Sequence, residues 1–558
     1  MRTGGKILVD QLVANGCRTL FTIPGESFLP ALDALFDDGP IRTIVCRQEG
    51  GAAMMAEAMG KLTGGPGVAF VTRAAGAANA VSGVYVAHHD ATPMLLLVGL
   101  SSRAKEDRGT FQEIDLKPIF GAMTKWVGIV RSAERIPEYV ARAYQTAMAG
   151  RPGPVVLGFP EDVLHEPAKV ADAAFNGPAS PAPSGADMAF VKGQLATSKR
   201  PLVLIGGGNW SQHASDRLAS VAKRFDLPVA TAFRRQDHFD NRHQNYVGHA
   251  GLGMGAKLAT AVRRADLLLV VGEAPGDVTT EGYSLVEVPR PKQVLVHAHP
   301  SADEPGRLYR TDLPIAAAPL PFIKALARFA KPNAIPTWAH ARQDLRRAYE
   351  RSLKPVATPG SVKLEAIIAA LSAELPEDAI VTNGAGNYTA FLHRYYQWKS
   401  YPSQLAPTSG SMGYGLPAAI AAKLAYPERT VVALAGDGCM LMTVQELATA
   451  VQYGLPIVII VANNAMYGTI RMRQERLYPG RVVATSLVNP DFAALARSFG
   501  AAGVTITRTE DFLPVLRRAL TVPLPTVIEL RLDPEAISPR QTLSEIRQTE
   551  RAKPRKRR

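Results

Sequence analysis

Short apolar runs alternate with amphipathic stretches along most of this chain. The stretch 1–16 has the pattern of an amphipathic helix. The run 93–99, PMLLLVG, is apolar throughout, which is typical of a strand covered on both faces of a parallel sheet. Strands are predicted in the first 165 residues at 19–23, 41–46, 68–72 and 93–99, and the segment ends with GPVVLG at 153–158. Strands that alternate with helical patterns predict an α/β fold with parallel sheets.

The same alternation continues to about residue 535, so the 558 residues are expected to form three doubly wound parallel-sheet domains. A stretch rich in Ala, Pro, Ser and Gly separates the first two domains and has the composition of a linker. Strands of the middle domain are predicted at 202–205, 228–230, 267–271 and 293–296. The predicted divisions are an N-terminal domain at 1–165, the linker at 166–187, a central domain at 188–330, a polar connector at 331–360, a third domain at 361–535 and a tail with a basic end at 536–558.

The third domain contains the most specific pattern. Its parts are an apolar run at 431–435, the turn Gly436-Asp437-Gly438, a helical pattern at 443–453, an apolar run at 457–462 and the pair Asn463-Asn464. A strand–helix–strand unit forms parallel strands, so Asp437 and Asn464 are expected at the carboxyl ends of neighbouring strands, where open α/β sheets bind ligands. A carboxylate and an amide oxygen suit Mg²⁺, which phosphate oxygens would complete. Either short motif alone would indicate only a turn or a polar loop, but the joint pattern is far more specific.

Charge adds a second candidate function. The net charge is +14, and part of it lies in the last residues, RAKPRKRR at 551–558. Such a tail could bind nucleic acid or an anionic membrane. A disordered, solubilising end is the favoured interpretation, because the run lacks the interleaved aromatic residues of single-strand binders.

Other features of the composition favour a cytoplasmic protein. No apolar run reaches the ~18–20 residues of a membrane-spanning helix, and the stretch 1–16 lacks the apolar core of a signal peptide. The three cysteines, Cys17, Cys46 and Cys439, show neither metal-ligand spacing nor an even disulfide framework.

The pattern from Gly436 to Asn464 resembles the motif of thiamine diphosphate (ThDP) enzymes that begins with GDG and ends with NN. The resemblance implies ThDP and Mg²⁺ as cofactors, and pyrimidine-binding, middle and diphosphate-binding domains. It also implies that Asp437, Asn464 and the main-chain carbonyl of Met466 bind Mg²⁺. Further cofactor contacts are implied for Gly436, Gly438, Cys439 and Gly468.

Glu49 follows an apolar run and opens a helical pattern. By position alone it is an acidic first-turn residue that the helix dipole stabilises. The resemblance implies a catalytic residue, because a Glu in this setting of ThDP enzymes hydrogen-bonds N1′ of the aminopyrimidine ring. The 4′-imino nitrogen then removes the proton from thiazolium C2, and the resulting ylide attacks a substrate carbonyl.

Two more segments resemble cofactor-binding parts of this family. Residues 408–415, TSGSMGYG, resemble the segment that holds the bent cofactor. By that match Gly410 offers its carbonyl to the 4′-amino group, and Met412 is the apolar wedge between the two rings, although ordinary packing would also explain a Met. The strand end at 382–387 resembles a diphosphate-binding turn, in which Gly386 and Asn387 are the candidate contacts.

Across nearly the whole chain the resemblance is greatest to catalytic subunits of acetohydroxyacid (acetolactate) synthases. The segments that carry it are FQE at 111–113, GRPGP at 150–154, MGYGLP at 412–417 and QELATA at 445–450. In that group Phe111 and Gln112, with the turn at Gly25, line the site from a second subunit. The resemblance therefore implies a homodimer or homotetramer with sites at subunit interfaces, and a small 2-oxoacid as substrate.

The chain departs from that group where the substrate is selected. Synthases carry an arginine in the middle domain that grips a carboxylate, whereas the corresponding stretch here, GEAPGDV at 272–278, has none. A tryptophan expected after the NN pair appears as Arg473. Gly206, Gly207 and Gly208 resemble flavin-contacting glycines, so FAD is a further candidate cofactor, but a plain strand-to-helix turn is the favoured interpretation.

The leading interpretation is a ThDP- and Mg²⁺-dependent enzyme that decarboxylates a 2-oxoacid and transfers the carbanion or enamine to an acceptor. Such a carboligase is favoured because the histidine pair of aldehyde-releasing decarboxylases is absent from its expected place near 108–111; His88 and His89 lie elsewhere. A 2-oxoacid decarboxylase or an acyl-transferring relative is the first alternative. A non-catalytic cofactor-binding protein is the second.

Overall fold

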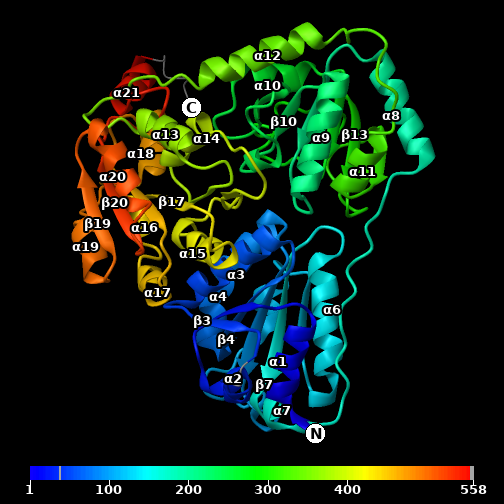
Figure 1. Cartoon of the computed structure of the whole chain (residues 1–558), viewed down its shortest axis with the longest axis vertical. Coiled ribbons are helices and arrows are strands. Elements are labelled where there is room, and N and C mark those ends of the chain that lie inside the picture. Colours follow the sequence, from blue (N-terminus) through cyan, green and yellow to red (C-terminus); the bar gives the residue numbers. More distant parts are fainter. Residues whose placement is uncertain (37–38, 553–558) are drawn as a thin grey trace. The chain divides into compact units, whose positions relative to one another are not determined.

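The computed structural model describes residues 1–36 and 39–552, so most of the basic end predicted at 551–558 lies outside the described residues. The chain forms two compact units, and Figure 1 colours it along the sequence. The first unit is Met1–Ala179, Pro407–Pro427 and Gln445–Tyr453; the second is Ser180–Ala406, Glu428–Val444 and Gly454–Arg558. In the described ranges, no helix has both the length and the apolar character that crossing a membrane requires.

The first unit is built on a six-stranded sheet of the order β3-β2-β4-β5-β7-β6, in which every neighbouring pair is parallel. The strands are β2 (Thr19–Thr22), β3 (Arg42–Val45), β4 (Gly67–Thr72), β5 (Met94–Leu100), β6 (Trp126–Ile129) and β7 (Pro154–Pro160). The four predicted strands of this region are confirmed as β2, β3, β4 and β5, and the closing stretch at 153–158 lies in β7. The prediction missed β6, because its four residues, WVGI, are short and mostly half-buried.

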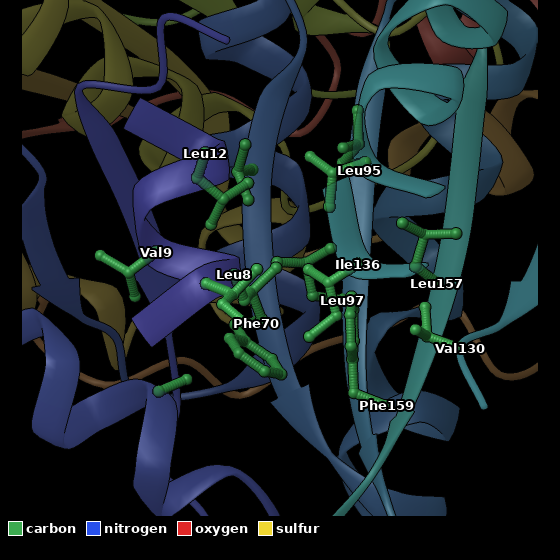
Figure 2. Close-up of a cluster of buried hydrophobic side chains, with 14 of the residues drawn as sticks. Leu8, Val9, Leu12, Phe70, Leu95, Leu97, Val130, Ile136, Leu157 and Phe159 are labelled. Carbon is green, nitrogen blue, oxygen red and sulfur yellow. The ribbon is translucent and has the colours of Figure 1, made fainter. Parts of the chain in front are cut away.

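Helices cover both faces of this sheet. On one face, α1 (Gly4–Ala14) and α6 (Ile136–Met148) share a core with alternate strand residues such as Leu95 and Leu97 (Figure 2). The helices α3 (Glu49–Thr63) and α4 (Arg73–Asp90) also pack on the sheet. The other elements of this unit are β1 (Arg2–Thr3), β8 (Pro167–Ala168), α2 (Leu29–Phe36), α5 (Leu116–Phe120), α7 (Glu161–His165), α15 (Gly415–Ala425) and α17 (Glu446–Gln452). Strand β8, at the start of the predicted linker, pairs antiparallel with β1.

The second unit contains two further six-stranded sheets. The middle sheet has the order β11-β10-β9-β12-β13-β14, and its pairs are all parallel. The strands are β9 (Pro201–Ile205), β10 (Val229–Thr231), β11 (Tyr246–His249), β12 (Leu267–Val271), β13 (Val294–His299) and β14 (Leu313–Ala316). Counted from its own first strand this order is 3-2-1-4-5-6, the order of dinucleotide-binding folds. The helices of this region are α8 (Gly185–Thr197), α9 (Gln212–Phe225), α10 (Ala256–Arg264), α11 (Pro319–Leu326) and α12 (Ala339–Ser352).

The third sheet has the order β16-β15-β17-β18-β20-β19, again with parallel pairs only. The strands are β15 (Ile380–Asn383), β16 (Gln404–Leu405), β17 (Val431–Gly436), β18 (Val458–Asn463), β19 (Ala502–Ile506) and β20 (Thr526–Arg531). Counted from its own first strand, its order is the same as that of the N-terminal sheet. The helices are α13 (Leu364–Glu374), α14 (Tyr388–Tyr395), α16 (Asp437–Met440), α18 (Gly468–Leu477), α19 (Phe492–Ser498), α20 (Phe512–Ala519) and α21 (Leu543–Ala552). The expected α/β fold with three parallel sheets is therefore confirmed.

Two local features differ from the predictions. The helix expected at 443–453 begins three residues later, as α17, and the shorter α16 precedes it. The C-terminal stretch from 536 to 552, assigned to a tail, is packed instead. Its residues Ile537, Leu543 and Ile546 are buried in one apolar cluster. The spacing of Leu543 and Ile546 places both on one face of α21, which contacts α18.

Candidate active site

The predicted site residues fall into two groups, one in each unit. In the second unit, Gly436 is paired with Ala462 across the adjacent parallel strands β17 and β18. Asp437 therefore lies one residue beyond this pair and Asn464 two residues beyond it. The expected placement at the carboxyl ends of neighbouring strands is present, and Asp437 also begins the short helix α16.

The Asp437 carboxylate is buried and accepts several hydrogen bonds. Its Oδ1 accepts the main-chain N–H of Gly438 at 2.9 Å. Its Oδ2 accepts the main-chain N–H of Met466 at 3.2 Å and Nδ2 of Asn489 at 2.8 Å. Burial raises the pKa of the Asp437 carboxyl, although the hydrogen bonds oppose the shift. A cation beside this carboxylate would relieve the cost of burying its charge.

Asn489 is a site residue that the sequence analysis missed. Its Nδ2 bridges Asp437 and Oδ1 of Asn463, the second bond being 3.0 Å long. Among the described residues, the buried Oδ1 of Asn489 has no hydrogen-bond partner. A buried carboxylate beside an unused amide oxygen fits a hard cation such as Mg²⁺, which prefers oxygen ligands. Only the location of Asn489 in the fold identifies it, since it lies 25 residues beyond Asn464 in no recognisable motif.

The two asparagines that end β18 have different surroundings. Asn463 donates from Nδ2 to Glu529 at 2.7 Å and accepts from Asn489. Asn464 is half-buried, and its side chain makes no hydrogen bond within the described part of the chain. The following loop is braced by the main chain of residues 485–487 through two hydrogen bonds of 2.9 Å. The structure thus leaves Asn464 available as an oxygen ligand, and the carbonyl of Met466 lies in the braced loop.

The glycine turn after β17 is closely packed by aromatic rings. If Gly438 were replaced by a residue with a side chain, its Cβ would lie 2.6 Å from Cε1 of Tyr467, which is too close for van der Waals contact. A Cβ on Gly436 would lie 3.0 Å from the ring of Tyr388. Tyr388 also donates from its hydroxyl to Sγ of the buried Cys439 at 3.4 Å. The Tyr467 ring therefore leaves room only for a glycine at position 438. The bond from Tyr388 holds Cys439 in the same turn.

The strand end at β15 contributes Gly386 and Asn387. The Asn387 amide donates to the carbonyl oxygens of Ile537 at 3.1 Å and Gly468 at 3.4 Å, and its Oδ1 accepts the Thr469 hydroxyl at 2.8 Å. The structure thus brings Asn387 and Gly468 together. The Asn387 side chain is used to hold the start of α18, and the carbonyls of Gly386 and Asn387 accept from residues 389 and 390. A diphosphate at this turn would therefore be bound by their main-chain N–H groups.

In the first unit, Glu49 is the first residue of α3, as expected. Its Oε2 accepts a hydrogen bond of 2.9 Å from Nδ2 of Asn79 on α4. A Cβ on Gly76 would lie 3.5 Å from Oε1 of Glu49. Asn79 is a second residue that the sequence analysis did not assign, because its helix is adjacent to Glu49 only in the fold.

A second carboxylate, from another helix, packs against the start of α3. Glu446, from α17, is fully buried, and both of its oxygens accept from the main-chain N–H of Arg47, at 3.1 and 3.3 Å. Its Oε2 also accepts the hydroxyl of Thr449 at 2.7 Å. Burial raises the pKa of the Glu446 carboxyl. A Cβ on Gly51 would lie 2.5 Å from Oε1 of Glu446, so the helix that carries Glu49 packs directly on this carboxylate.

The loop that carries Gly410 and Met412 precedes α15 in the first unit. Gly410 has a φ of +74°, a conformation that other residues rarely adopt, and its Cβ position is open. Its main-chain N–H donates to the carbonyl of Pro407 at 3.0 Å. Met412 is half-buried. These two residues therefore lie in the same unit as Glu49, and α15 packs against α3 (Figure 1).

Gly25, Phe111 and Gln112 are also in the first unit. Gly25 follows β2 and lies so close to Thr72, at the end of β4, that a Cβ would be 2.6 Å from the Thr72 hydroxyl. Gln112 accepts at its carbonyl from the main-chain N–H of Ala74, in the first turn of α4, at 3.1 Å. Phe111 is 74% exposed. Single exposed apolar side chains are common on protein surfaces, so this exposure by itself assigns no partner.

The middle sheet was the candidate site for FAD. Its glycine turn follows β9, at the point where the strand order reverses between β9 and β12. Trp210 Nε1 donates to the carbonyl of Gly206 at 2.7 Å, and His238 Nε2 lies 3.1 Å from the carbonyl of Gly207. A Cβ on Gly206 would lie 2.9 Å from Cδ of Glu273. An indole and a carboxylate thus pack against this turn, as in a plain strand-to-helix turn, and the carboxylate of Glu273 beside Gly206 disfavours an approaching pyrophosphate.

No group of three or more His, Cys, Asp and Glu side chains arranged as metal ligands occurs in residues 1–36 and 39–552. A site built from Asp437, Asn464 and a main-chain carbonyl has a different ligand set, one that suits Mg²⁺. For ThDP, the fit in the first unit rests on a half-buried Glu49 whose one oxygen is held by Asn79. The fit in the second unit rests on Asp437 at a sheet end.

The chain matches three family profiles in order: "Thiamine pyrophosphate enzyme, N-terminal TPP binding domain" at 2–119, the central domain at 189–326 and the C-terminal TPP binding domain at 384–530.

Similar full-length proteins are acetolactate synthases. The chain is 33% identical over 549 residues to the acetolactate synthase large subunit of Parasynechococcus marenigrum, covering 95% of this chain and 87% of that protein. It is 28% identical over 538 residues to the acetolactate synthase isozyme 3 large subunit of Escherichia coli, covering 93% and 92%. It is 28% identical over 556 residues to the mitochondrial acetolactate synthase catalytic subunit of Saccharomyces cerevisiae, covering 95% and 81%. The chain therefore belongs to the thiamine pyrophosphate enzyme family and carries the N-terminal, central and C-terminal domains of that family in one polypeptide.

Proposed function

We propose that this protein decarboxylates a 2-oxoacid with ThDP and Mg²⁺ and joins the remaining acyl group to an acceptor carbonyl. The observation that carries this proposal is the joint presence of Glu49, held by Asn79, and of Asp437 beside Asn464 at a sheet end. The acetolactate synthases to which the chain is similar support the reaction class.

Glu49 is the proposed carboxylate that hydrogen-bonds the aminopyrimidine ring and so positions a proton on it. Asn79 orients the Glu49 carboxylate through Oε2 and leaves Oε1 without a hydrogen bond in the described structure. Oε1 is therefore the oxygen that would bind N1′ of the aminopyrimidine ring. When bound, ThDP supplies a nucleophilic carbon and an electron sink for the decarboxylation. The Gly410 carbonyl and the Met412 side chain would hold the pyrimidine end of the cofactor.

Asp437, Asn464 and the carbonyl of Met466 would hold Mg²⁺, which in turn binds the diphosphate. The main-chain N–H groups around Gly438 and Gly468 are the proposed phosphate contacts. The carboxylate is buried and the loop of Met466 is braced, so the ligands are held in position before the ion binds.

The acceptor depends on residues at which this chain departs from the acetolactate synthases. The stretch 272–278 lacks an arginine and instead contributes Glu273, which lies against Gly206. A carboxylate at this position disfavours a second 2-oxoacid bound there in the manner of acetolactate synthesis. The proposed anion-binding residues in its place are Arg473 on α18, Arg234 and Arg235. A 2-oxoacid decarboxylase or acyl-transferring enzyme is therefore the second candidate function.

The assembly and the compartment are proposed on separate grounds. We propose a homodimer or homotetramer in which the exposed Phe111, with Gln112 and Gly25, reaches the site of a partner subunit. The three cysteines are buried free thiols, which supports a reducing compartment such as the cytoplasm.

A panel of 2-oxoacids distinguishes the two candidate functions. Purified protein with ThDP and Mg²⁺ is incubated with each acid, alone and with an aldehyde or second oxoacid, while CO₂ and ligated product are measured together. Carboligation predicts CO₂ and ligated product in equal amounts for at least one pair. CO₂ with free aldehyde favours the decarboxylase, and no CO₂ from any acid contradicts both.

A further inference from the structure

An arginine at the carboxyl edge of the first sheet has no role in the site described so far. Arg73 follows β4 and is the first residue of α4. Its φ of +20° lies outside the usual range of residues with a side chain. Its side chain is 13% exposed, and its Nη2 donates to Oε2 of Glu161 at 3.2 Å. Within the described residues this is the one hydrogen bond of the guanidinium, and the buried Nε has no partner.

The strand order places Arg73 beside the ends of β5 and β7. Strand β5 lies between β4 and β7, and its Leu100 is paired with Pro160 of β7. Ser101 and Glu161 therefore both follow this pair, and Arg73 reaches Glu161 across the end of β5. The buried Oγ of Ser101 also has no hydrogen-bond partner in the part of the chain that the structure describes. Two unsatisfied polar groups thus lie at adjacent strand ends.

The same edge carries two residues that are proposed to line the substrate site. Gly25 follows β2 and packs against the side chain of Thr72, the residue before Arg73. The carbonyl of Gln112 accepts the main-chain N–H of Ala74, the residue after Arg73, at 3.1 Å. All of these contacts lie in the first unit of one chain. Arg73 therefore lies beside the residues that are proposed to reach the site of a partner subunit.

Stability does not explain the arrangement of Arg73. A partly exposed ion pair contributes little to folding, whereas a buried N–H group without a partner costs free energy. A residue in a rarely populated backbone conformation adds to that cost, and such residues cluster at binding and catalytic sites. Because Glu161 uses only one nitrogen of the guanidinium, Arg73 keeps N–H donors for a planar anion such as a carboxylate.

The chemistry of decarboxylation restricts which carboxylate would bind there. The carboxylate that leaves as CO₂ loses its charge on the way to the transition state. An arginine that grips it would stabilise the ground state more than the transition state and would slow the reaction. A carboxylate that the product retains keeps its charge throughout. Binding that group would hold the substrate in place without opposing the loss of CO₂.

We propose that Arg73 binds a substrate carboxylate that the product retains, on the donor 2-oxoacid or on the acceptor. Arg73 is then a specificity-determining residue that favours substrates with a second anionic group. It is distinct from the arginines proposed in the second unit. The inference rests on the proposed function, because it assumes that the substrate site lies at this sheet edge.

CO₂ release from two donor acids of equal chain length tests the donor. 2-Oxoglutarate carries a second carboxylate, and 2-oxopentanoate lacks it. With ThDP and Mg²⁺, the wild-type protein is expected to have a kcat/KM about tenfold higher for 2-oxoglutarate, the scale of one hydrogen bond to a charged group. Arg73→Met is expected to remove this preference, mainly through KM. Arg73→Lys is expected to keep part of it, since it keeps the charge.

A parallel measurement tests the acceptor. If the retained carboxylate belongs to the acceptor, CO₂ release shows no preference between the two donors. The preference then appears in the yield of ligated product with glyoxylate rather than acetaldehyde as acceptor, and Arg73→Met removes it. A wild-type protein that prefers the charged form of neither substrate overturns the inference.

Arg103→Met is the matched control. Arg103 lies just beyond the end of β5 and is also bound to carboxylates, but all three of its nitrogens are used, by Asp162, Glu166 and the carbonyl of Arg131. This variant is expected to keep the wild-type ratio of kcat/KM values. An equal loss of preference in Arg103→Met and Arg73→Met overturns the inference.

Calorimetric titration with glutarate separates the inference from the proposed function. Glutarate has two carboxylates but no 2-oxo group, so it cannot be decarboxylated. If no acid releases CO₂, the proposed function fails, and glutarate binding to the protein with ThDP and Mg²⁺ decides the inference. Binding about tenfold weaker in Arg73→Met than in wild type supports it. Equal titrations of the two proteins overturn it.

Discussion

The side-chain amide of Asn79 donates a hydrogen bond of 2.9 Å to Oε2 of Glu49. The two residues belong to different helices, α4 and α3, so the bond fixes the carboxylate from outside its own helix. Only Oε2 is held in this way among the described contacts. The other oxygen, Oε1, keeps its capacity to bind the cofactor ring.

Removing the Asn79 amide should therefore slow catalysis while leaving ThDP binding in place. Asn79→Leu is expected to lower kcat roughly tenfold, since a hydrogen bond to a charged group contributes ~1.5 kcal/mol. The Kd for ThDP should change less than twofold. Steady-state kinetics and a ThDP titration measure both, with Tyr85→Phe, an exposed position on the same helix, as the control. An unchanged kcat in Asn79→Leu would show that Glu49 needs no such support.

Asn489 should matter for the metal. It orients both Asp437 and Asn463, and partners of metal ligands typically change metal affinity by ~10–100-fold when removed. Asn489→Ala is expected to raise the Mg²⁺ concentration for half-maximal activity by about that factor. The control is Thr485→Val, which removes the hydrogen bond to Gln474 in the same region without touching Asp437. Equal Mg²⁺ dependence in the two variants would refute this role.

The packing of α21 on α18 should depend on pH. Arg547 donates to both oxygens of the buried Glu475 carboxylate, at 2.9 and 2.8 Å, and these bonds, with others, lower the Glu475 pKa to about 2. The unfolded value is about 4.3. Because the folded pKa is the lower one, the pair stabilises fully above about pH 4.3, and this contribution disappears as the pH falls toward 2.

Arg547→Met is therefore expected to lower the free energy of unfolding by ~2 kcal/mol at neutral pH. The difference from wild type should shrink below about pH 4, as urea unfolding at several pH values would measure. Arg508→Met, which breaks an exposed pair with Asp511, should cost less than ~1 kcal/mol throughout. A difference for Arg547→Met that grows on acidification would contradict the assignment.

The middle domain should not bind FAD. Trp210 and Glu273 occupy the surroundings of Gly206, so the purified protein is expected to lack flavin absorbance and to be unaffected by added FAD in activity or melting temperature. Copurification of one flavin per chain would contradict this expectation.

The parts of the fold that were predictable are those in which the signal is local. Strands such as β5 and β18 are buried on both faces and appear as continuous apolar runs. Strand β14 alternates in exposure over only four residues, and such a short run gives no clear period. The packed C-terminal helix α21 was missed because the basic composition around it masks the apolar pair that buries it.

The candidate site likewise contains residues that the local sequence predicts and residues that it does not. Asp437 and Asn464 were predictable because glycines and asparagines directly after apolar runs mark the ends of parallel strands. Asn79, Asn489 and Glu446 were not, because each acts on a residue that is distant in sequence. Their roles follow only from the pairing of strands and helices, and no spacing rule connects them with Glu49 or Asp437.

Glu49 is proposed to activate bound ThDP, and this role is tested by the rate at which the C2 proton of protein-bound ThDP exchanges with D₂O in Glu49→Gln. The glutamine keeps the size of the side chain but cannot act as a carboxylate. Exchange is expected to slow by at least ~100-fold, the usual range of acid–base assistance, while ThDP and Mg²⁺ still bind. Exchange at the wild-type rate in Glu49→Gln would contradict it.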